Sequence, residues 1–406
     1  MKRKLSDLCL GGGNYGIAAS AVPYSENLPT YLRITDINDD GTINFEGLKS
    51  IDAPNSSKYY LEPNDIVFAR TGASTGRNYF YDGTDGDFVY AGFLIKFSID
   101  PKKANPLYVK YYCQSKDYYD WVASFNTGST RGNINAVTLG NMPIPNITRE
   151  QQDLIAGILS VLDAEIALNK KINHHLEQIA QAIFKSWFVD FEPWGGIMPD
   201  DWRKELLGEL CTTVTKGTTP TTLKKQFVQQ GINFVKAESI LDDHSIDFGK
   251  LAYIDDDTNA LLSRSVIQAS DIIFTIAGTL GRFAFVSEDL LPANTNQAVA
   301  IIRADTSKIN PVTLYSLFVG GLHSDFYTKN IQQAVQANLS LMVIKALPVC
   351  LPPNETLAEY SALIHPLFGK IFQNYTENQR LATLRDSLLP RLMSGELSVA
   401  DLDGVK

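Results

Sequence analysis

Residues 149–188 read REQQDLIAGILSVLDAEIALNKKINHHLEQIAQAIFKSWF, and this stretch decides the fold. It contains no proline and only one glycine, Gly157. Thr148 stands three residues before Gln151, a spacing typical of a capping box at a helix start. A helix of this length measures about 60 Å and needs a partner of similar length to cover its apolar side. That side is predicted by apolar residues mostly three or four positions apart: Ile155, Leu159, Leu162, Ile166, Ile172, Leu176, Ile179 and Ile183.

The predicted partner is the C-terminal stretch 354–393, NETLAEYSALIHPLFGKIFQNYTENQRLATLRDSLLPRLM. An offset of 205 residues aligns it with the first stretch, so that Asn169 matches Asn374 and Asn173 matches Asn378. Polar residues inside an apolar seam are a known means of fixing helix register. Pro366 is expected to kink this second helix or to delay its start. We therefore predict two long helices packed antiparallel, in preference to two unrelated amphipathic helices on separate cores.

Nearly the same offset relates the segments that precede the two helices. NDIVFARTGASTGRNYF (64–80) is repeated as SDIIFTIAGTLGRFAFV (270–286), with Asp65 and Asp271 in matching places. The run FVYAGFLIKF (88–97) is expected to form one buried strand. The chain is thus one α+β unit written twice, a pseudo-two-fold object. Its predicted segments are a globular domain (1–148), a long helix (149–193), a second similar domain (198–353) and a second long helix (354–406).

Composition excludes several classes of protein. An apolar content of 44% and a charged content of 20% over 406 residues indicate a multidomain globular protein. There is no run of eighteen apolar residues, so no membrane span is expected, and the N-terminus lacks the apolar core of a signal peptide. A cytoplasmic location is therefore expected. Four widely spaced cysteines without CxxC spacing indicate reduced thiols, not disulfides or a zinc site.

Signatures of catalysis are scarce. The run GGGNYG (11–16) has the spacing of a dinucleotide loop, but Pro23 interrupts the segment after it, and the second copy has only TKGTTP in its place. There is no GxxxxGK[ST] motif and no nuclease-like carboxylate–lysine set. The adjacent His174 and His175 point about 100° apart on a helix, so they cannot chelate one ion together. We predict a chain with no catalytic residue, no cofactor of its own and no metal.

Polar loops are the better candidates for function. Each domain has a strand that ends in a glycine-punctuated loop with an arginine (71–77 and 277–282), and a second polar loop (127–135 and 332–338). Such side chains bond phosphates and base edges, and a duplicated unit suits a DNA target read at two half-sites. Arg70 has no basic counterpart at Ile276, which makes it a candidate for sequence discrimination. The predicted DNA-binding residues are Arg33, Arg70, Thr71, Ser74, Thr75, Arg77, Arg131, Lys216, Lys224, Lys236, Thr279, Arg282 and Gln336.

Charge argues against DNA binding at first sight, because the net charge is −9. Each globular domain is close to neutral, so any surface that faces DNA must be one-sided. Counterion release from one such face is modest. We therefore expect weak binding by the chain alone and tight binding within a larger, more basic assembly.

These features together resemble the specificity (S) subunit of Type I restriction-modification enzymes. The resemblance covers the whole chain and rests on the order and duplication of its motifs. They are NDIVFARTGASTGR and its echo SDIIFTIAGTLGR, TKGTTP followed by GINFVKAESI, the loops ending in GNIN and QANLS, the first long helix, and the C-terminal QRLATLRDSLLPRLMSGELSV. The loop from Gly72 to Gly76 is one residue longer than that from Gly278 to Gly281, so different half-sites are expected.

The resemblance implies two target-recognition domains that each read half of a split sequence in double-stranded DNA, joined by an antiparallel coiled coil. It also implies two methyltransferase subunits as partners, with restriction subunits joining for cleavage. S-adenosylmethionine, ATP and Mg would belong to those partners. Two alternatives stay open at this point: a non-catalytic scaffold that pairs two similar protein or glycan ligands, and a nuclease-containing enzyme.

Overall fold

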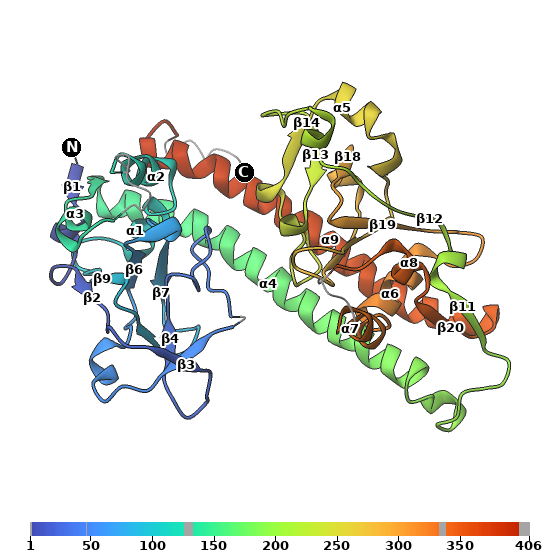
Figure 1. Ribbon diagram of the computed structural model, residues 1–406. Helices are drawn as coiled ribbons and strands as arrows, with labels where there is room; N and C mark the ends of the chain where they lie inside the picture. Colours follow the sequence, from blue (N-terminus) through green and yellow to red (C-terminus); the bar gives the residue numbers. More distant parts are fainter. Residues whose placement is uncertain (1, 46, 126–132, 333–337, 398–406) are drawn as a thin grey trace. The chain divides into compact units, whose positions relative to one another are not determined.

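The computed structural model describes residues 2–45, 47–125, 133–332 and 338–397. The chain divides into two compact units (Figure 1). Unit 1 comprises the chain up to Ala164 together with the C-terminal segment from Leu381, and unit 2 comprises Glu165–Arg380. Within the described residues, no helix is both long and apolar enough to cross a membrane.

The first long helix, α4, spans Arg149–Phe188, so it begins as predicted and ends five residues before the predicted limit of 193. Its start has the reciprocal bonds of a capping box: the Gln151 backbone N–H donates to Thr148 Oγ1 at 3.2 Å, and the Thr148 N–H donates to Gln151 Oε1 at 3.0 Å. The predicted apolar stripe is buried or half-buried except at Ile179, which is 49% exposed. Ile179 is therefore wrongly assigned to the stripe.

The second long helix, α9, spans Asn354–Ser394. Pro366 does not delay its start, so that part of the prediction is wrong. Proline removes the N–H that would bond the carbonyl of Ala362. Both residues are exposed, so water can bond that carbonyl and the helix tolerates the loss.

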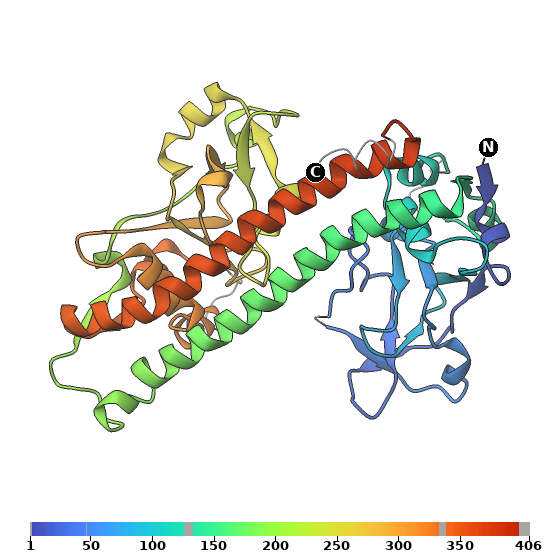
Figure 2. The same cartoon turned by 180° about the vertical axis from the view of Figure 1, so that it is seen from behind.

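Within unit 2 the two helices are antiparallel (Figure 2). Asn169 Nδ2 donates to Asn378 Oδ1 at 3.0 Å, and Asn374 Nδ2 donates to Asn173 Oδ1 at 2.7 Å, so partner numbers fall as α4 numbers rise. The two hydrogen bonds are equivalent under the sequence repeat. Asn169 corresponds to Asn374 and Asn378 corresponds to Asn173, so the offset of 205 residues converts one bonded pair into the other. Asn169, Asn173 and Asn374 are buried. A slip of register would leave their amides unbonded, so the asparagines fix the pairing.

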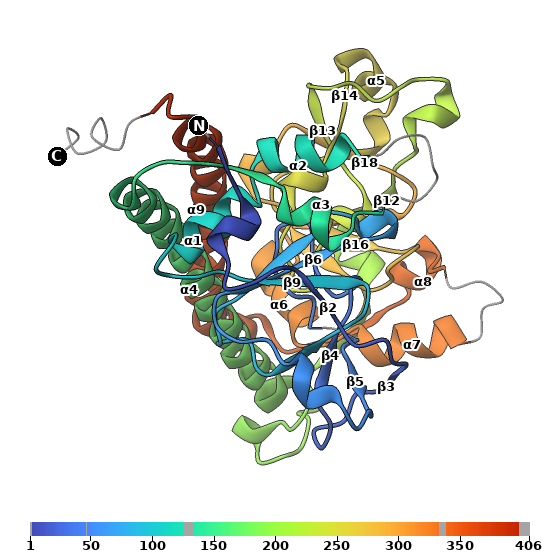
Figure 3. The same ribbon diagram turned by 90° about the vertical axis from the view of Figure 1, so that its left-hand side faces the viewer.

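Unit 1 contains three small sheets and three short helices, α1 (Pro106–Tyr112), α2 (Lys116–Ala123) and α3 (Ala136–Gly140). The β2, β9 and β6 strands lie side by side in Figure 3. The sheets have the orders β1 (Lys2–Lys4)–β10 (Pro143–Pro145); β2 (Asn14–Tyr15)–β9 (Leu94–Ser98)–β6 (Asp65–Ala69)–β7 (Asn78–Tyr81); and β3 (Ala21–Pro23)–β5 (Lys49–Ile51)–β4 (Thr30–Leu32)–β8 (Phe88–Tyr90).

Unit 2 repeats this plan, with helices α5 (Asp256–Leu261), α6 (Pro311–Val319), α7 (Ser324–Gln332) and α8 (Leu341–Lys345). In both units the third sheet contains one parallel pair, β4 with β8 and β13 with β18. The orders are β11 (Arg203–Leu206)–β20 (Pro348–Leu351); β12 (Cys211–Lys216)–β19 (Val299–Ala304)–β16 (Ile272–Thr275)–β17 (Phe283–Phe285); and β14 (Ala252–Ile254)–β13 (Ile232–Val235)–β18 (Ala293–Thr295)–β15 (Val266–Ile267). The duplication seen in the sequence is therefore also a duplication of the first two sheets and of three strands of the third. The fourth strand of the third sheet differs, because β3 pairs with β5 in unit 1 and β15 pairs with β18 at the opposite edge in unit 2.

The run 88–97 is not one strand, contrary to the prediction. It divides into β8 and β9, which belong to different sheets. The chain turns at Gly92, whose N–H donates to the Ile17 carbonyl at 2.8 Å, while the Leu94 N–H donates back to the Ala91 carbonyl at 2.8 Å. Continuous apolar character reports burial on both faces, but it does not show where a buried chain turns.

Each core includes one end of both long helices. In unit 1, Ile155 and Leu159 of α4 and Leu392 of α9 belong to the core that also holds Phe68. In unit 2, Phe184 of α4 belongs to the core with residues of α9, namely Tyr360, Ile364, Phe368 and Ile371. The compact units therefore take in helix ends that the sequence-based domain limits, 1–148 and 198–353, leave out.

Both repeats bury the aspartate of the shared motif. Asp65 is 1% exposed and pairs with Lys96 Nζ at 2.8 Å, and Asp271 is fully buried and accepts two 2.7 Å bonds from Arg303. Strand register makes Arg303 the counterpart of Ser98 in the first repeat, not of Lys96. Both repeats thus have a buried carboxylate, but its cationic partner comes from different positions on the neighbouring strand. A partner is needed in each case because burial of an unpaired charge has a large desolvation cost.

We expect a half-buried histidine to make unit 2 sensitive to acid. At the repeat offset of 205 residues, His323 corresponds to Tyr118 of the first repeat, and its ring centroid lies 5.2 Å from that of Phe283 and 5.4 Å from that of Phe318. Burial among these rings, with a smaller effect of His244, lowers the pKa of His323 to about 4. The unfolded chain has a histidine pKa of about 6.5, so it takes up the proton first as the pH falls. We expect up to about 3 kcal/mol of stability to be lost between pH 6.5 and pH 4.

Denaturant unfolding of the full chain at pH 7.5 and pH 5 measures this loss, with His323→Tyr as the matched variant because the first repeat uses tyrosine there. The difference in pH dependence between the two proteins isolates His323 from groups such as Glu177, whose pKa burial raises to about 7. An identical pH dependence in both proteins would contradict the prediction.

Candidate nucleic-acid interface

A glycine-punctuated loop follows the central strand in each unit. Its backbone has φ of 76° at Gly72 and 90° at Gly76 in unit 1, and 79° at Gly278 and 88° at Gly281 in unit 2. These are left-handed conformations that favour glycine. The loops therefore share their bends, although the second is one residue shorter.

The arginine at the end of each loop holds an acidic turn. Arg77 Nε donates to Asp39 Oδ1 at 2.6 Å, and its Nη1 donates to the Ile37 carbonyl at 3.2 Å. In unit 2, Arg282 bonds the Asp242 carboxylate through two nitrogens and the corresponding carbonyl of Ile240. DNA contacts of Arg77 and Arg282 remain a prediction. In this structure both side chains form hydrogen bonds within their own unit.

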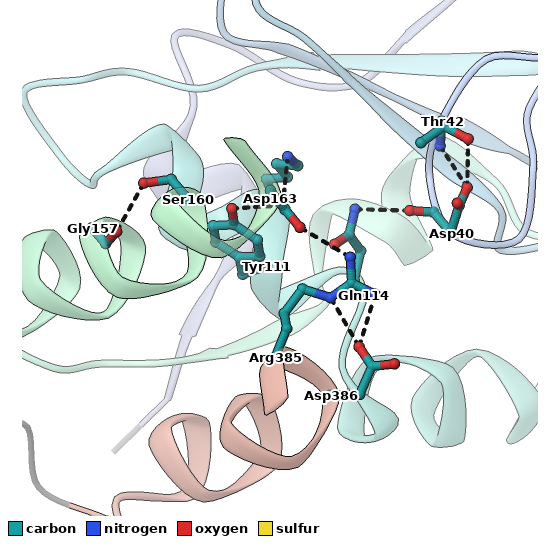
Figure 4. Close-up of polar contacts among 10 residues, drawn as sticks. Asp40, Thr42, Tyr111, Gln114, Gly157, Ser160, Asp163, Arg385 and Asp386 are labelled. Carbon is teal, nitrogen blue, oxygen red and sulfur yellow. Dashed lines mark hydrogen bonds and ion pairs between the residues drawn. The ribbon is translucent and has the colours of Figure 1, made fainter. Parts of the chain in front are cut away.

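Other side chains anchor the same turns. In unit 1, Gln114 Nε2 donates to the Asp40 carbonyl at 3.3 Å (Figure 4), and Tyr119 Oη donates to the Asp39 carbonyl at 3.2 Å. In unit 2, Tyr375 of α9 donates to the Asp243 carbonyl at 2.6 Å. The second turn is therefore attached directly to a long helix.

A polar network connects α4 with α1 and α9 within unit 1 (Figure 4). Asp163 of α4 accepts from Tyr111 Oη at 2.8 Å and from Arg385 Nη1 at 2.9 Å, and Lys110 Nζ lies 3.4 Å away. Burial raises the pKa of Asp163, but Lys110, Arg385 and Tyr111 outweigh it and leave the pKa below its ordinary value. The carboxylate thus holds one globular domain to both long helices.

Most of the remaining unit 1 candidates point inward. Arg33 forms a bidentate pair with Asp36 at 2.9 and 2.6 Å and also bonds the Gly47 carbonyl. Ser74 is 9% exposed, and Thr75 Oγ1 donates to the Gly72 carbonyl at 2.7 Å. These side chains shape the loop in the structure. Thr71 pairs with Asn133 through a short β-bridge, and Arg131 lies outside the described residues.

Arg70 differs from the other arginines. Its guanidinium carbon lies 5.2 Å from the centroid of the Tyr15 ring. Its Nε is buried and has no hydrogen-bond partner among the described residues. A guanidinium held over an aromatic face without a carboxylate partner is free to bond an incoming ligand.

The predicted DNA-binding residues of unit 2 differ from one another in exposure and in their contacts. Lys236 pairs with Glu238 at 2.6 Å, whereas Lys224 and Thr279 are exposed. Lys216 ends β12, is half-buried and forms no ion pair within the described part of the chain. Gln336 lies outside the described residues. The two units therefore do not present the same cations, as the unequal loops already indicated.

The sequence analysis assigned no role to Tyr15 or to the acidic turn that begins at Asp39. Asp39 and Asp242 are 203 residues apart, so the repeat contained a signal that the turn belongs to the motif. Tyr15 stood inside a glycine-rich run that was considered only as a cofactor loop. Among the described residues, no group of three or more His, Cys, Asp or Glu side chains is arranged to hold a metal ion.

The comparison with protein families fits this duplicated arrangement. The family described as "Type I restriction modification DNA specificity domain" matches residues 2–178 and again residues 199–381. The chain belongs to this family. The two matches correspond to the two repeats. Each match covers one globular domain and much of the long helix that follows it.

Two curated relatives and one solved structure agree with the assignment. The MjaIX specificity subunit of Methanocaldococcus jannaschii is 28% identical over 73% of this chain and 70% of its own length. The HindI specificity subunit of Haemophilus influenzae is 23% identical over 85% of this chain and 89% of its own. A Type I S subunit from M. genitalium has the same fold, with a TM-score of 0.55, 17% identity, and coverage of 97% of this chain and 95% of its own.

Proposed function

We propose that this specificity subunit reads a bipartite site in double-stranded DNA, with each globular domain reading one half. The observation that carries the proposal is the repetition of one surface construction in two domains whose central four-stranded sheets, β2–β9–β6–β7 and β12–β19–β16–β17, have the same strand order. In both, a glycine-bent loop follows the central strand and its arginine holds an acidic turn. A target with two separate half-sites suits a reader with two similar domains.

The differences between the domains favour two different half-sites. Arg70 in the first domain corresponds to the buried Ile276 in the second, and the loops after them differ by one residue. Groups that contact base edges determine sequence preference, whereas phosphate contacts position the protein. Unequal base-contacting groups therefore support an asymmetric site.

We further propose that the chain carries no catalytic residue and positions partner subunits on the DNA. Two methyltransferase subunits would bind S-adenosylmethionine, and restriction subunits would use ATP and Mg. The near-neutral recognition domains support this division, because tight binding then requires basic surface from the partners. The long helices, which include exposed apolar residues such as Val161 and Leu168, offer surface for such partners.

Mapping of modified bases in a host that expresses this chain together with the methyltransferase subunits of its system tests the proposal. The expected result is one split motif, in which two specified groups of bases flank a gap of fixed length. A continuous motif would overturn the bipartite reading. Modification that does not depend on the chain would overturn DNA recognition itself and leave the protein- or glycan-pairing scaffold as the alternative.

A further inference from the structure

The backbone around Arg70 is fixed on both sides. Its N–H donates to the Phe93 carbonyl at 3.1 Å, and its carbonyl accepts from the Ile134 N–H at 2.9 Å. The second repeat has the same bonds at Ile276, from Ile276 N–H to the Ala298 carbonyl at 2.8 Å and from Leu339 N–H to Ile276 at 3.0 Å. Position 70 is therefore a rigid point at the end of the central strand, and only its side chain differs between the domains.

The side chain of Arg70 is also held in place. It lies over Tyr15, whose hydroxyl accepts from the Ala136 N–H at 3.1 Å and is thereby fixed in its turn. Its Nε is sealed from solvent without a bond, and no described residue bonds either terminal nitrogen. A buried donor without a partner costs about 1–3 kcal/mol, and such groups concentrate at functional sites. The guanidinium is thus oriented in advance for a ligand that the free protein lacks.

The register of the sheets identifies the counterpart of this arrangement in unit 2. Tyr15 pairs with Ile95, which lies opposite Phe68, and Lys216 pairs with Ala300, which lies opposite Phe274. Phe68 and Phe274 are repeat mates, so Lys216 takes the place of Tyr15. The glycine that follows each makes the same close approach to a backbone carbonyl, Ala91 or Thr295.

Each domain therefore has at this place a cation, Arg70 or Lys216, that forms no ion pair within the described residues, and the two cations lie on different strands. In unit 1 the cation extends from the end of β6, and the neighbouring strand supplies an aromatic ring. In unit 2 the end of β16 is followed by Ile276, which is 2% exposed, and the neighbouring strand supplies Lys216. A cation needed only for solubility would not be kept at one place of the fold while its strand changed.

We propose that Arg70 and Lys216 are specificity-determining residues that each bond a guanine in the half-site read by their own domain. This inference rests on the proposed bipartite function. A flat guanidinium or an ammonium group matches the O6 and N7 acceptors of guanine in the major groove. Stacking on Tyr15 fixes the plane of Arg70, which suits the two parallel bonds of a bidentate contact. Lys216 makes a point-like contact, so its preference for guanine is the weaker of the two.

The test uses the complex of this chain with its methyltransferase subunits. Base-modification mapping is compared for the wild-type chain, Arg70→Met and Lys216→Met, with Lys224→Met as the matched control at an exposed cation. Arg70→Met is expected to lower the preference for guanine over other bases by about 5- to 150-fold at one position of one half-site. Lys216→Met is expected to lower the preference for guanine at a position of the other half-site. The control is expected to leave the motif unchanged and to weaken binding of all sequences alike.

A second measurement needs no variant and so does not depend on the folding of one. Wild-type complex is titrated with a duplex that carries 7-deazaguanine at each guanine of the motif in turn, which removes N7 but keeps base pairing. Affinity is expected to fall at one guanine in each half-site. Equal affinity for all these duplexes, or a variant that loses affinity with an unchanged motif, would make both residues phosphate contacts and overturn the inference. A wild-type complex without any sequence preference would instead overturn the proposed function.

Discussion

Replacement of Gly217 by alanine is expected to lower the free energy of unfolding by about 3 kcal/mol or more. A Cβ atom at this position would lie 1.8 Å from the Thr295 carbonyl oxygen, and the Gly217 N–H donates to the Asn296 carbonyl at 3.0 Å. Both neighbours are backbone atoms, so no side-chain rotation relieves the overlap. A shift of the Gly217 backbone away from Thr295 would relieve the overlap, but it would also break the hydrogen bond from the Gly217 N–H to the Asn296 carbonyl.

Urea unfolding of the full chain measures the effect, and Gly157→Ala is the matched control. Gly157 lies on α4 with nothing within 4 Å of an added Cβ, so alanine there is expected to stabilise the helix by about 0.5–1 kcal/mol. Gly16→Ala in the first repeat should act in the same direction as Gly217→Ala, because its Cβ would lie 2.3 Å from the Ala91 carbonyl oxygen. A Gly217→Ala protein as stable as the wild type would show that the strand does not pass Thr295 this closely.

The substitution Asp163→Ala is expected to destabilise unit 1 by about 2–3 kcal/mol. It leaves the Tyr111 hydroxyl and one side of the Arg385 guanidinium without their partner in a largely buried place. This expected loss of stability is at the low end for a buried ion pair, because the side chains of Asp163 and Arg385 are each 25% exposed to solvent. The pKa of Asp163 is depressed, so its contribution is present above the unfolded pKa near 4 and is lost as the pH falls below it.

A double-mutant cycle with Arg385→Ala separates the pair from the effects of each truncation. The coupling energy should be about 1–3 kcal/mol in the stabilising direction. Asp120→Ala is the control, because Asp120 forms an exposed pair with Lys116 on α2 of the same unit and should leave the unfolding midpoint unchanged. A coupling energy of zero would mean that the Asp163–Arg385 pair shown in Figure 4 does not hold α9 to α4.

Much of the fold was predictable because its signals are periodic. The apolar spacing predicted the start of α4 at Arg149 and its length to within five residues, and the offset of 205 predicted both the partner helix and the repetition of the domains. Repetition is robust evidence, because matches at one offset accumulate along the whole chain. The candidate interface was less predictable. Arg77 and Arg282 were correctly placed on equivalent loops, but their bonds to Asp39 and Asp242 depend on turns about forty residues away.

The duplication, the two long helices and the family can all be inferred from the amino-acid sequence, since each depends on patterns repeated within the chain. Which cations are paired can be seen only in the folded protein. Arg33, Arg70 and Arg77 look alike in sequence, yet two of them bond carboxylates and one lies over an aromatic ring. The equivalence of Tyr15 and Lys216 likewise emerged only from strand register. The physical reason is that periodicity reports which face of an element is buried, whereas the partner of a polar side chain is set by how separate elements meet in space.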